Sequence, residues 1–268
     1  MLKDITLGQY FPMKSIIHKL DARFKLCLTF VFIVMLFAAK TVVGLSVGFL
    51  YMVMVLVLSK IPPIMLIKAI KPVVPVLIFT AMLNLLFLHQ GEDVFRWKFI
   101  QITDYGIEMS VFMLVRIILL IMGTSLLTYT TSPIVLTDAI ERLLSPLKKI
   151  KFPVHELAMM MTIALRFVPT LIEETDKIMS AQKSRGASFD TGNLLNRARA
   201  LVPIMLPLFI SAFRRADELA TAMECRLYHG GEGRTRLKVL KSAVRDYAAV
   251  GVSVLFLAGV YIVNIYLA

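Results

Sequence analysis

Charged residues, and the residues that build catalytic or redox sites, are scarce in this sequence. Of its 268 residues, 18% are charged and 58% are hydrophobic, and the mean hydropathy is +0.77. An ordinary soluble domain does not have this composition. There are two cysteines, Cys27 in an apolar run and Cys225 in a basic segment. We therefore expect two free thiols and no disulfide.

Motifs for nucleotide, metal and substrate chemistry are also missing. No Walker-type glycine loop occurs, so the chain is not expected to be its own ATPase. The histidines are scattered, with no carboxylate or thiol at helical spacing, which argues against a metal site; they are His18, His89, His155 and His229. Because no catalytic cluster is visible either, the sequence predicts a protein that is not an enzyme and has no cofactor and no metal.

Ionisable side chains are nearly absent from the longest apolar runs, where Arg116 is the clear exception. Charges inside a membrane normally mark ion or proton pathways, so their near absence argues against a proton-coupled carrier. For Arg116 we expect a structural role, facing a backbone carbonyl or the interior of a helix bundle. The first apolar run has no small-residue cleavage site behind it, and a cleaved signal peptide is therefore not expected.

Long apolar runs are what the sequence does contain. They predict an all-α integral membrane protein with about five transmembrane helices in the lipid bilayer, four before the middle of the chain and one at its end. The expected spans are residues 24–40, 42–59, 72–88, 106–130 and 247–267. Between Phe24 and Leu58 the run is interrupted only by Lys40, and one tilted span in place of two short ones stays open.

The distribution of charge orients these spans. From Thr131 to Arg245 there are 18 Lys and Arg against 11 Asp and Glu, whereas acids outnumber bases between the third and fourth spans. By the positive-inside rule, this segment and the N-terminus lie in the cytosol and the C-terminus lies outside. The net charge of +12 is thus explained without nucleic-acid binding. We expect an N-terminal membrane domain at 1–130, a cytosolic helical domain at 131–245 and a final transmembrane helix at 246–268.

The cytosolic domain is predicted to consist of three helices. Ser132-Pro133 is a helix start, with serine as N-cap and proline in the first turn, and this first helix ends near Pro146. The second and third helices are expected at about 155–185 and 194–226. Within the third, the apolar part at 200–213 is short for a span and is flanked by charge. This favours a helix at the membrane interface, while a re-entrant or spanning arrangement stays open.

The second and third of these helices each end in a short element with an arginine at its centre. The elements are Ser184-Arg185-Gly186 and Cys225-Arg226-Leu227. Helix capping alone can explain either one, since a cation near a helix C-terminus is stabilised by about 0.3–1 kcal/mol. Two such endings on consecutive helices indicate protruding contacts with a partner that has two similar subunits. An arginine fork suits this role, because it can bond carboxylates or backbone carbonyls in a partner's groove.

Three stretches of the chain resemble the transmembrane T component of energy-coupling factor (ECF) transporters. They are Leu20-Asp21-Ala22-Arg23-Phe24-Lys25 before the first span, Ser184-Arg185-Gly186, and the segment from Ala222 to Arg236. The likeness covers essentially the whole chain, including the order of its spans and cytosolic helices. Leu227 stands where the family's second motif has glycine, so we expect the third helix to continue slightly and to stop at Gly230-Gly231.

In that family the T component links two cytosolic ABC-type ATPases to a small membrane-embedded S component that captures a vitamin or a transition-metal ion. The resemblance implies the same role here, in the plasma membrane, through coupling helices and without chemistry of the chain's own. It assigns one ATPase to Arg185 and the other to Arg226, with Ser184, Gly186, Cys225 and Leu227 as their flanks. A self-contained secondary transporter is the alternative, although the inverted repeats and mid-membrane charges expected of it are not found. The substrate is not specified, since specificity would reside in the S component.

Overall fold

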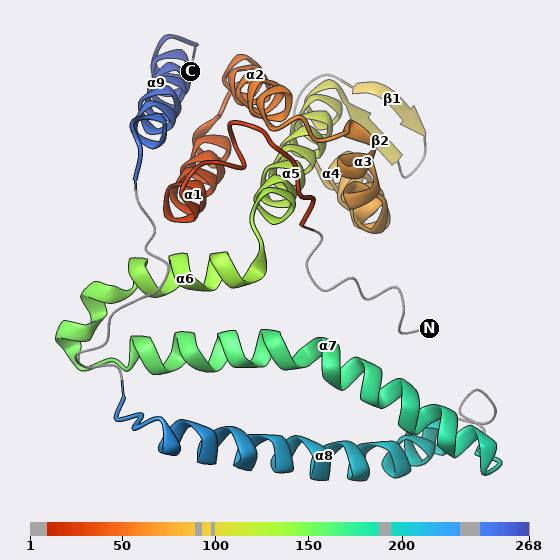
Figure 1. Ribbon diagram of the computed structural model, residues 1–268. Coiled ribbons are helices and arrows are strands. Elements are labelled where there is room, and N and C mark those ends of the chain that lie inside the picture. The colour runs from red at the N-terminus through yellow and green to blue at the C-terminus, as the bar shows by residue number, and fades with distance from the viewer. Residues whose placement is uncertain (1–9, 89–92, 98–99, 188–193, 231–241, 268) are drawn as a thin grey trace. The chain divides into compact units, whose positions relative to one another are not determined.

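The computed structural model describes residues 10–88, 93–97, 100–187, 194–230 and 242–267 (Figure 1). The chain divides into two compact units. One comprises Gly8–Ala139 and Val239–Ala268, and we call it the bundle unit. The other is built around Ile140–Lys238, and we call it the arm unit.

Among the described residues, six α-helices belong wholly to the bundle unit, and three of them begin at a side-chain cap. Asp21, Thr41 and Thr103 each accept a hydrogen bond from a backbone N–H in the first turn, which satisfies a donor that the helix itself leaves free. The chain turns at Ala39–Thr41, so two short helices, and not one continuous helix, lie where the sequence predicts two short spans. The elements are α1 (Ala22–Ala38), α2 (Val42–Ser59), α3 (Pro63–Ile70), the 3-10 turn η2 (Lys71–Val73), α4 (Val74–Phe87), α5 (Asp104–Thr130) and α9 (Val244–Leu267).

The third predicted span is longer than expected. Its helical run begins at Pro63 and continues through α3, η2 and α4 to Phe87, 25 residues in all. Lys68 and Lys71, which precede the predicted start at about 72, lie within this helical run. Pro62-Pro63 instead provides the helix start, because proline fits the first helical turn. Long lysine side chains are tolerated there because they can extend from the helix toward water.

The connection between α4 and α5 contains a short antiparallel ribbon that the sequence did not predict. Its strands are β1 (Asp93–Trp97) and β2 (Ile100–Thr103), paired so that Trp97 lies opposite Ile100. Both stretches contain β-branched or aromatic residues, which favour strands over an irregular loop. All other regular elements of the described residues are helices, so the fold class remains all-α.

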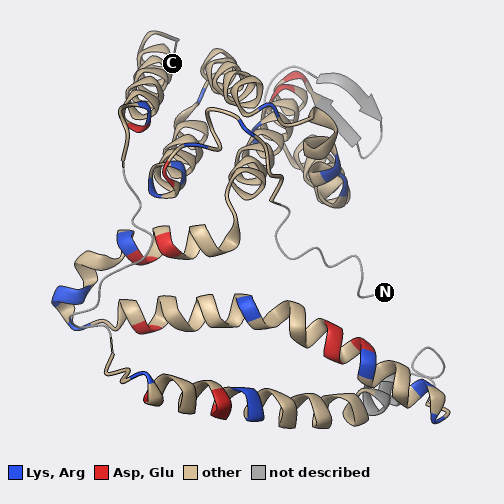
Figure 2. Ribbon diagram, viewed as in Figure 1, with Lys and Arg blue, Asp and Glu red and all other residues tan. Residues whose placement is uncertain are grey.

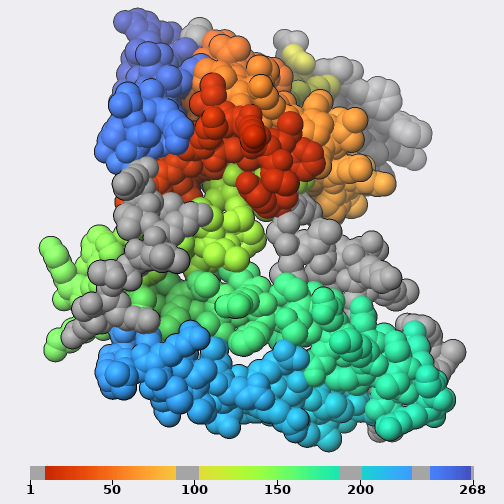
Figure 3. Space-filling model, viewed as in Figure 1, coloured from red at the N-terminus to blue at the C-terminus, as the bar shows by residue number. Residues whose placement is uncertain are grey.

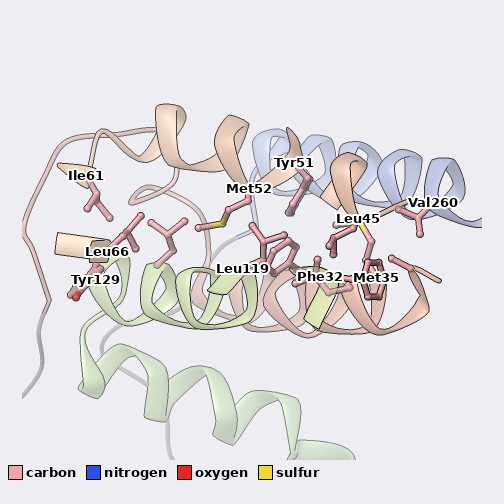
Figure 4. Packing of buried hydrophobic residues seen from close by; sticks show 14 residues of the cluster. Phe32, Met35, Leu45, Tyr51, Met52, Ile61, Leu66, Leu119, Tyr129 and Val260 are labelled. Carbon is pink, nitrogen blue, oxygen red and sulfur yellow. The ribbon is translucent and has the colours of Figure 1, made fainter. Parts of the chain in front are cut away.

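The core of the bundle unit lies where α1, α2, α5 and α9 meet (Figure 4). The rings of Phe32 and Tyr51 stack with their centroids 5.5 Å apart, and Leu36 and Leu119 are almost completely buried beside them. Gly123 lets α5 approach α1, since a Cβ atom at this position would lie 2.4 Å from the ring of Phe32. This close packing holds the two helices in one arrangement.

The outer surface of the bundle unit is strongly apolar. Phe30, Val57 and Phe79 are each more than 60% exposed. Figure 2 shows the charged residues of this unit gathered mainly toward the ends of its helices, with long uncharged stretches between them. Exposed apolar side chains in such number indicate a surface that faces lipid rather than water.

Five helical stretches of the described residues are long and apolar enough to cross a membrane. Four of them coincide with predicted spans, and the fifth is a helix of the arm unit that the sequence places in the cytosol. With 17 residues, α1 is at the short end of the range for a span. The five stretches are Val42–Ser59, Pro63–Phe87, Asp104–Thr130, Val154–Ser184 and Val244–Tyr266.

The arm unit consists of the predicted helices, which are confirmed. They are α6 (Pro133–Leu143), which begins in the bundle unit and is followed by the 3-10 helix η3 (Ser145–Ile150), α7 (Val154–Ser184) and α8 (Leu194–Cys225). The two long helices pack against each other and run in opposite directions (Figures 1 and 3). Their C-terminal ends, which carry the two arginine elements, therefore lie at opposite ends of the pair.

Candidate functional site

The end of α7 is a Schellman cap, a turn that closes a helix through two backbone hydrogen bonds. The N–H of Ala187 donates to the carbonyl of Gln182 at 3.0 Å, and the N–H of Gly186 donates to that of Lys183 at 3.0 Å. Gly186 has φ +86, in the left-handed region that glycine enters without steric cost. Arg185 is consequently the C-cap residue, the last one before the chain turns away.

The end of α8 has the same two hydrogen bonds. The N–H of Tyr228 donates to the carbonyl of Met223 at 3.1 Å, and the N–H of Leu227 donates to that of Glu224 at 2.8 Å. Leu227 occupies the left-handed position with φ 55. The expectation that this helix continues to Gly230-Gly231 is therefore wrong. The cap forms despite a side chain that disfavours this conformation by about 1–2 kcal/mol.

Arg185 and Arg226 thus hold equivalent positions, each immediately before a left-handed turn. Both residues are exposed, as are the flanking residues Ser184, Gly186, Cys225 and Leu227. Within the described residues neither guanidinium has a hydrogen-bond or ion-pair partner. The two elements do not combine into one pocket. They form two separate, similar projections.

A polar contact centred on Glu174 joins the two helices between these projections, and the Ser211 hydroxyl of α8 also hydrogen-bonds to its carboxylate. Arg215 of α8 donates to the carboxylate of Glu174 of α7 at 2.7 Å. Arg185 lies 11 residues after Glu174, and Arg226 lies 11 residues after Arg215. At about 1.5 Å per residue, each arginine is roughly 16 Å from the contact along its own helix. Because the helices are antiparallel, the two projections are equidistant from the contact, and their separation approaches about 30 Å.

One face of α8 is covered by large, exposed apolar side chains. They repeat at intervals of four residues and are each 49–65% exposed: Leu201, Val202, Met205, Leu206, Phe209, Ile210 and Phe213. The rings of Phe209 and Phe213 are in edge contact, with centroids 4.7 Å apart. A contiguous apolar patch of this size marks an interaction surface or a membrane contact.

A buried polar cluster secures the end of the bundle unit where α5 finishes and α9 begins. The Lys25 ammonium donates to the carbonyl of Thr130 at 2.9 Å, and the Asp246 carboxylate accepts from the backbone N–H of Asp21 at 3.0 Å. Asp246 is 1% exposed. Asp21 and Lys25 belong to the N-terminal stretch that the sequence singled out. Asp246 was missed, although an acidic residue at the start of an apolar run could have signalled it.

Arg116 has the structural role expected of it. Its guanidinium donates to the carbonyl of Ala39 just after α1 and lies 4.5 Å from the ring centroid of Phe112. Asn264 of α9 supports the same helix end, donating to the carbonyl of Ala38 at 2.6 Å. Two side chains from different helices thereby satisfy carbonyls that the end of α1 leaves free.

Two of the histidines that the structure describes, His18 and His155, are engaged in local contacts, and His229 is exposed. His155 lies 3.0 Å from a carboxylate oxygen of Glu141, a partner that sequence spacing did not reveal. His18 lies between the Ser15 hydroxyl at 2.7 Å and the carbonyl of Phe11 at 3.0 Å. No cluster of three or more potential metal ligands occurs among the described residues.

Comparison with known proteins covers nearly the whole chain. Residues 13–237 match the family model CbiQ, described as cobalt transport protein. The chain is 51% identical to a curated protein of Ruminiclostridium cellulolyticum over 98% of both chains, and 52% identical to one of Clostridium kluyveri over 93% of both. A Bacillus subtilis protein is 45% identical over 96% of this chain and 97% of its own. All three are energy-coupling factor transporter transmembrane proteins EcfT.

Family membership agrees with the fold. The matched residues run from the N-terminal polar segment through both arginine elements, and the apolar helices identify a multi-pass membrane protein. The resemblance drawn from three short motifs is thus confirmed over the length of the chain. The protein belongs to the CbiQ family of cobalt transport proteins, together with the transmembrane components of energy-coupling factor transporters.

Proposed function

We propose that this chain is the coupling subunit of an ECF-type importer, which connects two cytosolic ATPases to a membrane-embedded, substrate-binding S component. The observation that carries the proposal is the pair of helix caps closed by the same two backbone hydrogen bonds. Each presents an exposed arginine, and the two lie equidistant from the contact between Glu174 and Arg215. Two equivalent projections fit a partner that consists of two similar subunits. In this role the chain has no catalytic site of its own.

Each ATPase would receive one projection. The Schellman turn satisfies the last carbonyls of its helix, so the cap has a defined shape before any partner binds. Arg185 and Arg226 can then offer several N–H donors to carboxylates or carbonyls in a groove on the ATPase surface. Ser184 and Gly186 would contact the rim of one groove, and Cys225 and Leu227 the rim of the other.

The S component would contact the apolar face of α8. Its exposed leucine, methionine and phenylalanine side chains suit the apolar surface of another membrane protein. Methionine is adaptable because its side chain is unbranched and flexible. The substrate, a vitamin or a metal ion, would be held by the S component and not by this chain.

Motion would pass from the ATPases to the S component through α7 and α8. When two ATPases close on ATP, the caps that they hold must move relative to one another. The helices are continuous from each cap to the contact between Glu174 and Arg215, and they can therefore shift about this point as rigid levers. Any such shift displaces the apolar face of α8 together with the S component bound to it.

We place the arm unit and the N-terminus on the cytosolic side of the plasma membrane, with the C-terminus outside. The excess of Lys and Arg from Thr131 to Arg245 supports this orientation. Although α7 is long enough to span, it carries Glu156, Arg166 and Glu173 at intervals along its length. These charges favour a position in the cytosol or at the membrane interface.

The test is to replace Arg185 and Arg226 together by alanine in the assembled transporter. We expect ATP-driven uptake to be lost and the ATPases to be lost during purification. Arg166→Ala combined with Arg214→Ala is the matched control, since both are exposed arginines on the same helices but away from their ends. Normal uptake by the double cap variant would refute the proposal. Uptake by the chain without any partner would identify it as a self-contained carrier.

A further inference from the structure

The bundle unit contains an apolar cavity that the coupling role does not use. Its volume is about 300 Å³, at the lower end of the range for ligand pockets. Its walls come from α1, α2, α5 and α9 and from the segment that precedes α1. The cavity is bounded at one side by Phe32, whose ring stacks on Tyr51. The hydroxyl of Tyr51 is already bonded to that of Ser253 at 2.8 Å, so this polar pair needs no ligand.

The rim of the cavity reaches the outer surface of the unit. Ile16, Leu58 and Val252 line the cavity and are 58%, 37% and 40% exposed. The same surface carries the exposed apolar side chains that indicate contact with lipid. An opening of this kind is accessible to a hydrocarbon chain that enters sideways from the bilayer.

Positive charge surrounds the end of the cavity that is near the start of α1 and α9. Lys25 and the exposed Arg245 both contribute to its lining. Residues 10–25 and 242–248 together contain five basic residues and two acidic ones. The acids, Asp21 and Asp246, are buried and already accept backbone hydrogen bonds. Asp21 also pairs with Arg23 at 2.7 Å, so the unpaired excess of positive charge comes from the other basic residues.

We infer that this cavity binds one acyl chain of an anionic phospholipid from the cytosolic leaflet, with its phosphate beside Arg245. The inference rests on the membrane orientation given under the proposed function. Basic pockets between membrane helices on the cytosolic side recognise anionic headgroups in this way. Lys25 donates to the carbonyls of Thr130 and His18. Its charge therefore adds to the local potential, while Arg245 makes the direct contact.

The first test fills the cavity. Ala249 lies in its lining, and Ala249→Phe places a ring there; Ala258→Phe adds the same ring at an exposed position of α9 outside the lining. The full-length protein is purified from bilayers of equal parts phosphatidylglycerol and phosphatidylcholine with identical acyl chains, and retained lipid is counted by native mass spectrometry. We expect one retained phospholipid in the wild type and in Ala258→Phe, and none in Ala249→Phe. Equal retention by both variants, or a wild type without lipid, would overturn the inference.

The second test removes the headgroup contact without touching the core. We expect the wild type to prefer phosphatidylglycerol by about fivefold, the ratio that corresponds to one basic contact at a membrane surface. Arg245→Gln should abolish this preference, whereas Lys40→Gln, at the opposite end of α1, should keep it. Retention of both lipids equally by the wild type, or of a free fatty acid in place of phospholipid, would overturn the inference. No ATPase is present in either test, so the result is independent of whether the arginine caps bind ATPases.

Discussion

The two arginine-capped helix ends share their hydrogen bonds but differ in the residue that makes the turn. Gly186 reaches φ +86 freely, whereas Leu227 adopts φ 55 against a preference of about 1–2 kcal/mol. Leu227 is 78% exposed, so packing of its side chain within the chain offsets little of this unfavourable free energy. A strained residue at an exposed helix end indicates that the turn itself is needed there. The feature common to both ends is the position of the arginine, and glycine is only one way to obtain it.

Removing one arginine at a time should cause the largest change in the affinity of the chain for an ATPase. If the ends are equivalent, Arg185→Ala and Arg226→Ala should each weaken attachment of an ATPase by at least about thirtyfold, the usual result of truncating one partner of a buried charged contact. Titration of the purified chain with ATPase, followed by calorimetry, measures this directly. Arg214→Ala should bind normally. A large effect at one end only would show that the ends are not equivalent.

Gly186→Val should have the next largest effect. A β-branched side chain at φ +86 disfavours the turn by about 1–2 kcal/mol or more, so the cap of α7 should open and ATPase binding at this end should fall by about five- to thirtyfold. Hydrogen exchange at the amide of Ala187 reports the opening, because this amide closes the cap. Ala181→Val places the same side chain in the last helical turns with ordinary backbone angles. Unchanged exchange at Ala187 would contradict the cap geometry.

The contact between Glu174 and Arg215 should have a smaller effect, since its side chains are 23% and 34% exposed and water screens the pair. Glu174→Arg should lower the free energy of unfolding of the arm unit by about 1 kcal/mol or less, through repulsion of like charges. Adding Arg215→Glu reverses the pair and should restore both stability and coupled uptake. Thermal unfolding and uptake are measured for both single variants and for the double variant, as a double-mutant cycle. Failure of the double variant to recover would mean that the contact does not join the helices.

Leu227→Gly gives the end of α8 the same turn residue as the end of α7. It should change cap stability and ATPase binding only slightly. It relieves the left-handed strain, but glycine also makes the unfolded chain more flexible, so the net gain in cap stability is less than about 1 kcal/mol. ATPase binding should stay within about twofold of the wild type if the turn alone matters. A severalfold loss measured by the same calorimetry would show that the leucine side chain itself contacts the ATPase.

The sequence predicted the elements that follow from local rules and missed those that depend on distant partners. Helix periodicity and apolar length located the apolar helices and the three arm helices to within a few residues, apart from the early start at Pro63. The position of both arginines at helix ends was predicted from the sequence and agrees with the structure. The cap at Leu227 was not predicted, because the preference of the left-handed cap position for glycine is a tendency that backbone hydrogen bonding can override. Asp246 was missed because its importance depends on Asp21, 225 residues away.

A change of pH should alter the stability of the bundle unit but not the binding of ATPases at the two arginine ends. Burial holds the pKa of His18 below its ordinary value of 6.5, with a further lowering by Lys25 and an opposing effect from the hydrogen bond to the carbonyl of Phe11. Below pH 6.5 the unfolded chain takes up a proton that the folded chain resists, so stability should fall as pH drops from 7.5 toward 5.5. His18→Gln, which cannot titrate, should remove this component of the pH dependence of thermal unfolding, and the exposed His229→Gln should not. The proposed ATPase binding at both ends would rest on arginines that remain charged throughout this range. A loss of binding in step with the His18-dependent loss of stability would therefore show that the ends depend on the bundle unit.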